Sequence, residues 1–472
     1  MFIQNEKIDA AELAGMDKQH SLHPWSDLAT NQSEDPLVLA EAEGIHIRDA
    51  EGNQYIDGIG GMWCVQVGYG RKDIADVMAQ QARQMCYYTP FGAMTNVPAA
   101  RLAAALAERA PGDLNTVSFS TSGSDAVDSA VRFAHFYFNC LGKETKKQVI
   151  VRMDSYHGST YLTASMNGKR RDWSHFDYAR ELVHFLPSVN AFRRPADQSL
   201  EDFAAEKVAD LEAKILELGP ENVACFVAEP IQASGGIIVP PEAYLPQCLE
   251  ICRKYDVLYI SDEVVTAFGR LGHVFASENV FGIQPDIITC AKGLTSGYIP
   301  MGATLYSDRL IAAISGDKAV DHPYFTNGYT YSGHPVASAV ALKSLEILED
   351  EKILEQVRET GPYFLAQLEK LRDLPIVGDV RGMGLMACVE CVVRKVGAEP
   401  GEEDMAVAVR VDQHAQDRGL ILRPFESLCI MSPPLIVTKE DIDRIVTILR
   451  DSLIATQDDL IAEGVWSPSD AA

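Results

Sequence analysis

A lysine in a position suited to chemistry lies in the stretch 286–296, which reads DIITCAKGLTS. The run Ile287–Cys290 is apolar and mostly β-branched, which is typical of a strand buried on both faces. Lys292 follows the carboxyl end of this strand, where open α/β sheets bind their ligands. A lysine there can form a Schiff base with an aldehyde, because desolvation lowers its pKa and leaves a reactive free amine. A solvated loop cation would show the same pattern, so the interpretation depends on partners elsewhere.

A carboxylate occupies the corresponding place after the preceding strand. The run Val257–Ile260 is apolar and leads to Asp262, thirty residues before Lys292. An aromatic aldehyde cofactor with a ring nitrogen needs a carboxylate at that nitrogen and a lysine at the aldehyde. Asp262 alone could be a helix cap or a surface carboxylate. The pairing of Asp262 with Lys292 is more specific than either residue.

A candidate anion cradle lies further upstream. Residues 116–120 have the character of a strand, the turn 122–124 reads SGS, and helical periodicity follows over 125–140. Backbone N–H groups, hydroxyls and the helix dipole converge at such a turn and favour phosphate binding. The alternative is an ordinary capped helix, because serine and aspartate are common at helix starts.

Strands and helices alternate regularly from residue 148 onward, and polar or aromatic side chains follow the strands. Tyr156 and His157 follow the predicted strand at 149–152, and Glu229 follows the strand at 224–228. A doubly wound α/β sheet with a site along its carboxyl edge has this pattern.

The chain is too long for one core, since single cores stop growing at about 250 to 300 residues. We expect a polar N-terminal arm over 1–36 with Trp25 in its one apolar anchor. A hairpin over 37–59 is the N-terminal part (37–60) of a small domain, and a large domain spans 61–334. Helices and strands after residue 335 predict that 335–472 complete the small α+β domain.

Charge and composition exclude several classes of function. Lys and Arg total 41 against 67 Asp and Glu, a net charge of -26, which disfavours binding to nucleic acid or anionic membranes. The N-terminus lacks the pattern of a signal peptide, and no apolar run is long enough to span a bilayer. Ten cysteines scattered through apolar stretches indicate a reduced, cytoplasmic protein.

Other catalytic signatures are missing. The pair Cys388 and Cys391 lies in a strand-like run without a second pair or a nearby histidine, so we expect no metal. The Walker A, G-x-S-x-G and H-E-x-x-H motifs do not occur.

The chain resembles the class III, fold type I aminotransferases that use pyridoxal 5'-phosphate (PLP), from about residue 36 to 452. The motifs that carry the resemblance are GGMWCVQVGYGR (60–71), SGSDAVDSAVR (122–132), SYHGST (155–160), AEPIQASGG (228–236), SDEVVTAFGRLG (261–272), AKGLTSGYIPMGA (291–303), GYTYSGHPVA (328–337) and LILRPF (420–425). It implies a large domain with a mostly parallel, seven-stranded sheet and a smaller α+β domain. Trp63, the YTYSGHP run and Arg423 resemble the ω-amino acid or amine:pyruvate branch.

The resemblance implies a role for each motif residue. Lys292 would bind the cofactor aldehyde and shuttle a proton, and Asp262 would keep the pyridine nitrogen protonated. The cofactor-binding set that the resemblance implies is Ser122, Gly123, Ser124, Tyr156, His157, Glu229, Asp262, Val264, Lys292 and Thr330. Within it, Tyr156 and Val264 would contact the two ring faces. Asp125 stands where glutamate is more usual.

Two further implications concern partners. Thr330 would complete the phosphate site of a neighbouring subunit, so we expect a homodimer with shared active sites, or a tetramer built from it. Trp63, Tyr156 and Arg423 would bind substrate, with Arg423 gripping the carboxylate of an α-keto acid. Glu229 is a candidate partner for Arg423 or for a donor group.

The expected reaction is ping-pong transfer of an amino group from an amine or ω-amino acid to an α-keto acid, with pyruvate preferred. An aminomutase or a decarboxylase on the same fold remains an alternative. A non-catalytic relative would be expected to lack the lysine, which is present here. Taurine, β-alanine, putrescine and longer ω-amino acids all stay open as donors.

Overall fold

Seven strands form the large sheet, in the order β4-β10-β9-β8-β7-β5-β6, and within it β10 alone runs antiparallel to its neighbours. The computed structural model describes residues 9–315, 323–393 and 402–468. The strands of this sheet are β4 (Leu114–Ser120), β5 (Gln148–Arg152), β6 (Val183–Leu186), β7 (Val223–Ala228), β8 (Leu258–Asp262), β9 (Ile287–Cys290) and β10 (Gly302–Ser307). The prediction of a mostly parallel sheet is confirmed.

The parallel pairing brings the strand-end residues to one edge. In the register of β8 and β9, Asp262 is paired with Thr289, and Lys292 follows two residues after the end of β9. Strand β9 has the predicted bounds, whereas β8 extends to Asp262 itself. Because neighbouring parallel strands end on the same side, Asp262 and Lys292 project from the same edge of the sheet.

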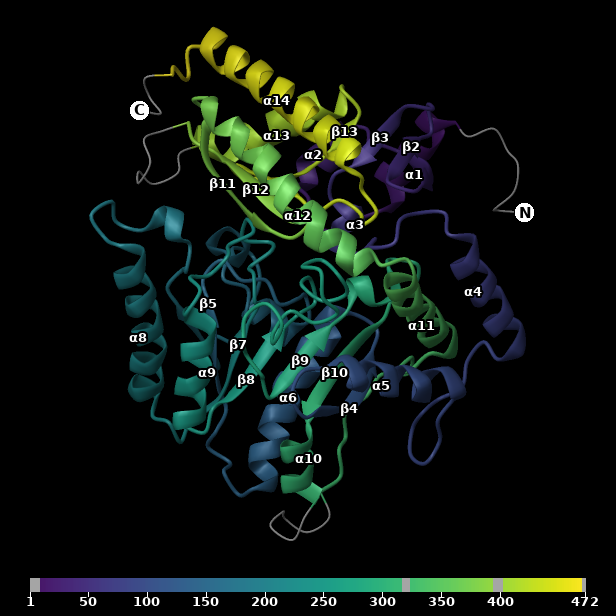
Figure 1. The fold of residues 1–472 in the computed structure, drawn as a ribbon, viewed down its shortest axis with the longest axis vertical. Helices are drawn as coiled ribbons and strands as arrows, with labels where there is room; N and C mark the ends of the chain where they lie inside the picture. The colour runs from purple at the N-terminus through teal and green to yellow at the C-terminus, as the bar shows by residue number, and fades with distance from the viewer. Residues whose placement is uncertain (1–8, 316–322, 394–401, 469–472) are drawn as a thin grey trace.

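Helices cover both faces of this sheet (Figure 1). Val149 and Val151 of β5 pack in a cluster with α6 (Gly123–Cys140), and Ile150 packs with α8 (Leu200–Leu218) and α9 (Tyr244–Lys254). Successive strand residues point to opposite faces, so an apolar run such as QVIVR has both faces buried. The other helices beside this sheet are α4 (Lys72–Gln84), α5 (Val97–Arg109), α7 (Tyr161–Ser165), α10 (Asp308–Ser315) and α11 (Pro335–Asp350).

The ends of the chain fold together into two smaller sheets. Their orders are β1-β2-β3-β13 and β11-β12-β15-β14. The strands are β1 (Leu39–Glu43), β2 (His46–Asp49), β3 (Gln54–Asp57), β11 (Val377–Met383), β12 (Met386–Cys391), β13 (Leu420–Ile421), β14 (Arg423–Phe425) and β15 (Leu428–Met431). The helices packed with them are α12 (Ile353–Glu369), α13 (Glu402–Gln416) and α14 (Lys439–Ala462). Figure 1 shows this part above the large sheet.

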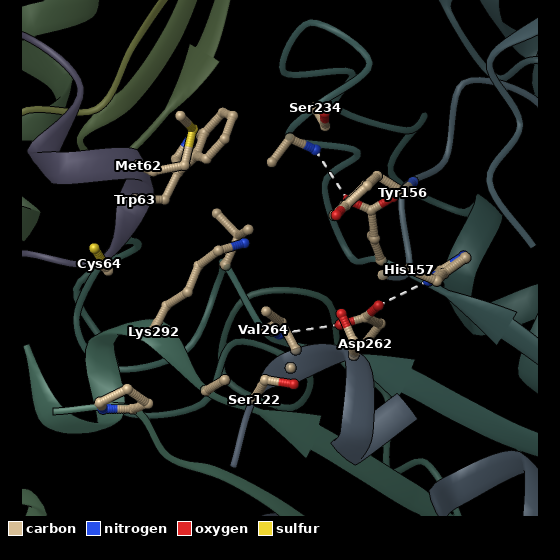
Figure 2. Close-up of a pocket in the computed structure, with 18 of the residues that line it drawn as sticks. Met62, Trp63, Cys64, Ser122, Tyr156, His157, Ser234, Asp262, Val264 and Lys292 are labelled. Atoms are coloured by element: carbon tan, nitrogen blue, oxygen red, sulfur yellow. Dashed lines mark hydrogen bonds and ion pairs between the residues drawn. The ribbon is translucent and has the colours of Figure 1, made fainter. Parts of the chain in front are cut away.

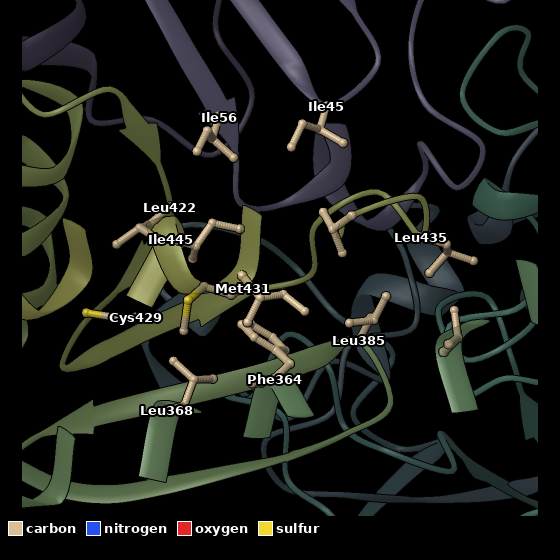
Figure 3. Close-up of a cluster of buried hydrophobic side chains, with 14 of the residues drawn as sticks. Ile45, Ile56, Phe364, Leu368, Leu385, Leu422, Cys429, Met431, Leu435 and Ile445 are labelled. Atoms are coloured by element: carbon tan, nitrogen blue, oxygen red, sulfur yellow. The ribbon is translucent and has the colours of Figure 1, made fainter. Parts of the chain in front are cut away.

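A shared core holds these chain ends together. Ile45 and Ile56, from the N-terminal strands, belong to the same buried cluster as Phe364, Leu422 and Met431 (Figure 3). Strand β13 also pairs in parallel with β3. The domain boundaries after residues 36, 60 and 334 stay predictions.

The N-terminal segment contains two helices, α1 (Ala10–His20) and α2 (Leu28–Ser33), which its polar composition did not indicate. Asp9 and Asp27 cap them by accepting hydrogen bonds from backbone N–H groups. Trp25, between the two helices, packs edge-on against Tyr156 with ring centroids 5.6 Å apart. The predicted apolar anchor therefore contacts the large sheet's functional edge.

Within residues 9–315, 323–393 and 402–468, no helix is long and apolar enough to cross a membrane. The same residues contain no group of three or more His, Cys, Asp or Glu side chains arranged to hold a metal ion.

Candidate active site

A cavity of about 420 Å³ opens at the carboxyl edge of the large sheet. Of the residues proposed from the sequence, those that line it are Trp63, Ser122, Gly123, Ser124, Tyr156, His157, Glu229, Asp262, Val264, Lys292 and Arg423. Figure 2 shows Lys292 reaching upward between Trp63 on one side and Tyr156 on the other. Thr330 is the one proposed residue that does not line this cavity.

Lys292 begins a single 3-10 turn, η3 (Lys292–Thr295), in a strained conformation. Its φ is 42°, in the left-handed region that residues other than glycine rarely adopt. Its Nζ lies 5.5 Å from the centroid of the Trp63 ring. Burial lowers the pKa of Lys292, partly opposed by Asp262. The structure therefore presents the lysine as an amine that loses its proton more readily than a free lysine.

Asp262 is held from three sides. Its Oδ2 lies 2.7 Å from Nδ1 of His157, and its Oδ1 accepts a hydrogen bond from the backbone N–H of Val264 at 3.1 Å. The hydroxyl of Thr289 lies 3.4 Å from Oδ1. Both His157 and Asp262 are buried, so the carboxylate keeps one orientation. That is the arrangement needed to hold a proton on a ring nitrogen.

The predicted anion cradle is the N-terminus of α6. Ser122 caps the helix by accepting from Asp125 N–H at 3.1 Å, and Ser124 Oγ accepts from Ser159 N–H at 3.0 Å. The first turn of a helix leaves N–H groups without intrahelical acceptors, and its dipole favours an anion. A Cβ on Gly123 would lie 2.7 Å from Cγ1 of Val264, so only glycine allows the two to approach this closely.

Trp63 is displayed by a loop with unusual backbone angles. Gly60, Gly61, Met62 and Trp63 have φ values of 58°, 60°, 94° and 61°. Asp57 accepts hydrogen bonds from the backbone of this loop, including Gly61 N–H at 2.7 Å. Strain of this kind persists only where the surroundings enforce it, and it is concentrated at functional sites.

Arg423, on β14, lies against the ring of Trp63. Its Cζ is 5.0 Å from the Trp63 ring centroid, and its Nη1 donates to Met62 Sδ at 3.0 Å. Its Nε is buried and has no hydrogen-bond partner among the described residues. Burial lowers the pKa of Arg423. The guanidinium thus retains donor capacity for a ligand.

Glu229 has different partners from those expected. Its Oε1 accepts from Tyr156 N–H at 3.0 Å and its Oε2 from Ala233 N–H at 3.1 Å, instead of pairing with Arg423. Burial raises its pKa. The candidate pairing with Arg423 is therefore wrong in this conformation, because both carboxylate oxygens are already bonded to the main chain.

Thr330 is exposed, and its carbonyl accepts a hydrogen bond from the Tyr87 hydroxyl at 2.6 Å. Neighbouring side chains on the same surface are apolar and exposed: Tyr88 54%, Phe91 50%, Val97 61% and Tyr331 58%.

The structure adds cavity residues that the sequence analysis did not propose. They include Trp25, Met62, Cys64, Lys169, Arg171 and Ser234. The run KRR at 169–171 was the available signal for two of them. These residues come from loops and from short helical turns such as η1 (Arg170–Trp173), which are too short for a sequence period to predict the direction of a side chain.

The set of donors in the cavity fits PLP. Lys292 suits its aldehyde, Asp262 its ring nitrogen and the start of α6 its phosphate, and the glycine at 123 leaves space beside Val264. Fold and site together define a PLP enzyme of fold type I.

Comparison with known proteins identifies the family. The model described as "Aminotransferase class-III" matches residues 28–453, and the chain belongs to this family. The putrescine–pyruvate aminotransferase of Pseudomonas aeruginosa is 39% identical over 94% of this chain and 96% of its own. Gamma-aminobutyrate transaminase 1, mitochondrial, of Oryza sativa is 36% identical over 90% of this chain and 82% of its own. The solved omega transaminase from Pseudomonas jessenii in complex with PMP has a TM-score of 0.91 and 35% identity, with 94% of this chain and 98% of that chain covered.

The family confirms the fold class, the aminotransferase activity and PLP as the cofactor. The chain is therefore an enzyme that moves an amino group from an amine to a keto acid.

Proposed function

We propose that this aminotransferase takes its amino group from an amine or ω-amino acid and gives it to pyruvate, by a ping-pong mechanism. The donor leaves as an aldehyde or ketone, and the keto acid leaves as an amino acid. The names of the relatives support this class of donor and acceptor. The observation that carries the proposal is that Lys292 and Arg423 both lie within 5.5 Å of the centroid of the same Trp63 ring.

We assign the cofactor contacts as follows. Ser122, Gly123 and Ser124 would hold the phosphate, and Asp262, oriented by His157, would keep the proton on the ring nitrogen. Tyr156 and Val264 would contact the cofactor ring. When bound, PLP stores the amino group between half-reactions and withdraws electrons from the substrate carbon.

Lys292 and Arg423 act on the substrates. Lys292 would take the proton from the donor carbon and pass it to the cofactor within the same half-reaction, and it would work in the reverse direction with the keto acid; its lowered pKa suits this use as a base. Arg423 binds the carboxylate of pyruvate, with which its planar fork can form two parallel hydrogen bonds. Trp63 and Tyr156 form the walls around the apolar part of the donor.

The proposed minimal unit is a homodimer in which Thr330 serves the partner's site. Two features support it: Thr330 is exposed outside the cavity of its own chain, and exposed apolar side chains surround it. Sedimentation should give at least twice the chain mass, and Phe91→Asp in the exposed patch should lower it to that of one chain. A cytoplasmic location stays a proposal, supported by ten cysteines that are all free thiols.

The visible absorption of the PLP-loaded enzyme tests the reaction. Addition of 1-phenylethylamine should bleach the band of the bound cofactor, and pyruvate should restore it. A band that responds to no amine would point to an aminomutase, a decarboxylase or a non-catalytic relative. Lys292→Ala should still bind PLP but should show neither change.

A further inference from the structure

Three cations line the active-site cavity, two of them without an assigned role. Lys169 is only 7% exposed, and its Nζ lies 5.8 Å from the ring centroid of Tyr156 and 4.3 Å from that of Phe425. The Cζ of Arg171 lies 4.2 Å from the same Phe425 ring. Arg423 contributes the third positive charge to the lining. Phe425 is thus flanked by two cations, next to the proposed keto acid site.

The carboxylates in the lining form no ion pair with these three cations, although the charges of Asp172 and Glu229 partly stabilise the protonated form of Lys169. Those that line the cavity are Glu229 and Asp262, and their oxygens already accept hydrogen bonds from Tyr156, Ala233, His157 and Val264. Arg171 does pair with Asp172 at 3.0 Å, at a site where its side chain is 45% exposed. Lys169, by contrast, donates to the neutral hydroxyl of Ser234.

Lys169 is therefore a buried cation whose hydrogen-bond acceptor carries no charge. Burial and the charge of Arg423 lower its pKa to about 8, so it remains mostly protonated at neutral pH. An anion placed beside Lys169 would stabilise its charge against burial and against the repulsion from Arg423. Figure 2 shows Ser234 on the side of the cavity next to Tyr156 and across from Trp63. Ser234, which accepts the hydrogen bond from Lys169, therefore lies on the cavity wall opposite Trp63.

We propose that Lys169 and Arg171, with Ser234, form a second anion position that binds the remote carboxylate of an ω-amino acid donor. The enzyme then selects ω-amino acids over diamines, because the remote ammonium of a diamine would lie among three cations. This inference rests on the proposed function and names the donor class that the same site accepts.

The test uses two donors of equal length. 4-Aminobutyrate and putrescine share a four-carbon chain and differ at the remote end, which is a carboxylate in one and an ammonium in the other. With pyruvate fixed and saturating, kcat/KM of the wild type should be at least about tenfold higher for 4-aminobutyrate, the size of effect expected for a hydrogen bond to a charged group. 1-Phenylethylamine, which has no remote charge, is the reference donor.

Lys169→Met should lower kcat/KM for 4-aminobutyrate by about tenfold or more and change that for 1-phenylethylamine by less than about twofold. Lys169→Arg should restore most of the loss. Arg170→Met is the matched control, since it removes a neighbouring positive charge from an exposed residue that does not line the cavity. It should leave the ratio between the two donors unchanged.

Three results would overturn the inference. The first is a wild type that prefers putrescine, and the second is an equal loss of kcat/KM for all donors in Lys169→Met. The third is a Lys169→Met variant in which only the preference between the acceptors 2-oxoglutarate and pyruvate changes. The last would assign the position to the acceptor. If 1-phenylethylamine transfers its amino group to pyruvate while one of these results is found, only this inference fails. If no donor supports transfer, the proposed function fails first.

Discussion

Nδ1 of His157 lies 2.7 Å from Oδ2 of Asp262, and both side chains are buried. Since a carboxylate only accepts, Nδ1 carries the proton and His157 fixes the carboxylate in place. His157→Leu should lower kcat/KM by about 10- to 100-fold, as expected for the loss of a hydrogen bond to a charged group.

His157→Asn is the matched variant, because its amide N–H can take the place of Nδ1–H. It should restore most of the rate. Equal kcat/KM values in the wild type and in both variants would show that His157 merely fills space.

Arg423→Ala separates the two half-reactions. Loss of a two-pronged contact with the keto acid should reduce the pyruvate half-reaction by about 10- to 100-fold in kcat/KM. The half-reaction with 1-phenylethylamine should change by less than about threefold, because that donor has no carboxylate. Arg423→Lys should lie between the two. Stopped-flow absorption of the cofactor measures each half alone, and equal losses in both would remove Arg423 from the carboxylate role.

Gly123→Ala tests the fit between the anion cradle and Val264. The added Cβ would lie 2.7 Å from Cγ1 and 3.0 Å from Cγ2 of Val264, so the helix start or the valine must move. PLP affinity should fall by about tenfold, the loss of a contact worth about 1.4 kcal/mol. Gly15→Ala, at a helical glycine with nothing within 4 Å, is the control. Val264→Ala added to Gly123→Ala should recover affinity, and additive losses would contradict the steric explanation.

Asp412 provides a pH-dependent prediction outside the cavity. Its Oδ1 accepts from Leu422 N–H at 2.9 Å, next to Arg423, and burial raises its pKa to about 6. The usual pKa of this carboxyl is near 3.8, so as pH rises from 3.8 to 6 Asp412 ionises in the unfolded chain before it ionises in the folded protein. Ionisation of Asp412 therefore destabilises the folded state increasingly through this pH range. Asp412→Asn keeps an acceptor and should raise the free energy of unfolding at pH 8 by up to about 3 kcal/mol.

The gain from Asp412→Asn should nearly vanish at about pH 3, below both pKa values, where the wild-type carboxyl is mostly protonated in the folded and unfolded states. Denaturant titrations at the two pH values measure it. An equal gain at both would show that the effect is not ionisation of Asp412.

The strand-borne part of the site was predictable from sequence. Asp262 ends β8, and Lys292 and the start of α6 follow β9 and β4; because strands of the same direction end at one edge, their meeting point follows from the fold class. The bounds of β9 were predicted correctly for the same reason, since a short apolar run between turn residues has few other structures.

Residues placed by tertiary packing were not predictable in this way. Lys169 and Arg171 reach the cavity from an irregular segment, and their proximity to Phe425 joins positions more than 250 residues apart. Glu229 was correctly expected at a strand end, but its partners depend on the path of the loops carrying Tyr156 and Ala233. The helix α1 was missed because its apolar residues form no buried stripe: Ala14 is buried, whereas Leu13 and Met16 are exposed.

Transfer of nitrogen tests the central claim most directly. The purified enzyme with PLP is incubated with ¹⁵N-labelled 1-phenylethylamine and unlabelled pyruvate, and the alanine formed is analysed by mass spectrometry, with Lys292→Ala as the blank. The account predicts that ¹⁵N appears in alanine in step with acetophenone release, and that the lysine variant loses at least about 10³-fold of this rate, within the range that a catalytic base supplies. Release of acetophenone without labelled alanine, or equal transfer by Lys292→Ala, would contradict it.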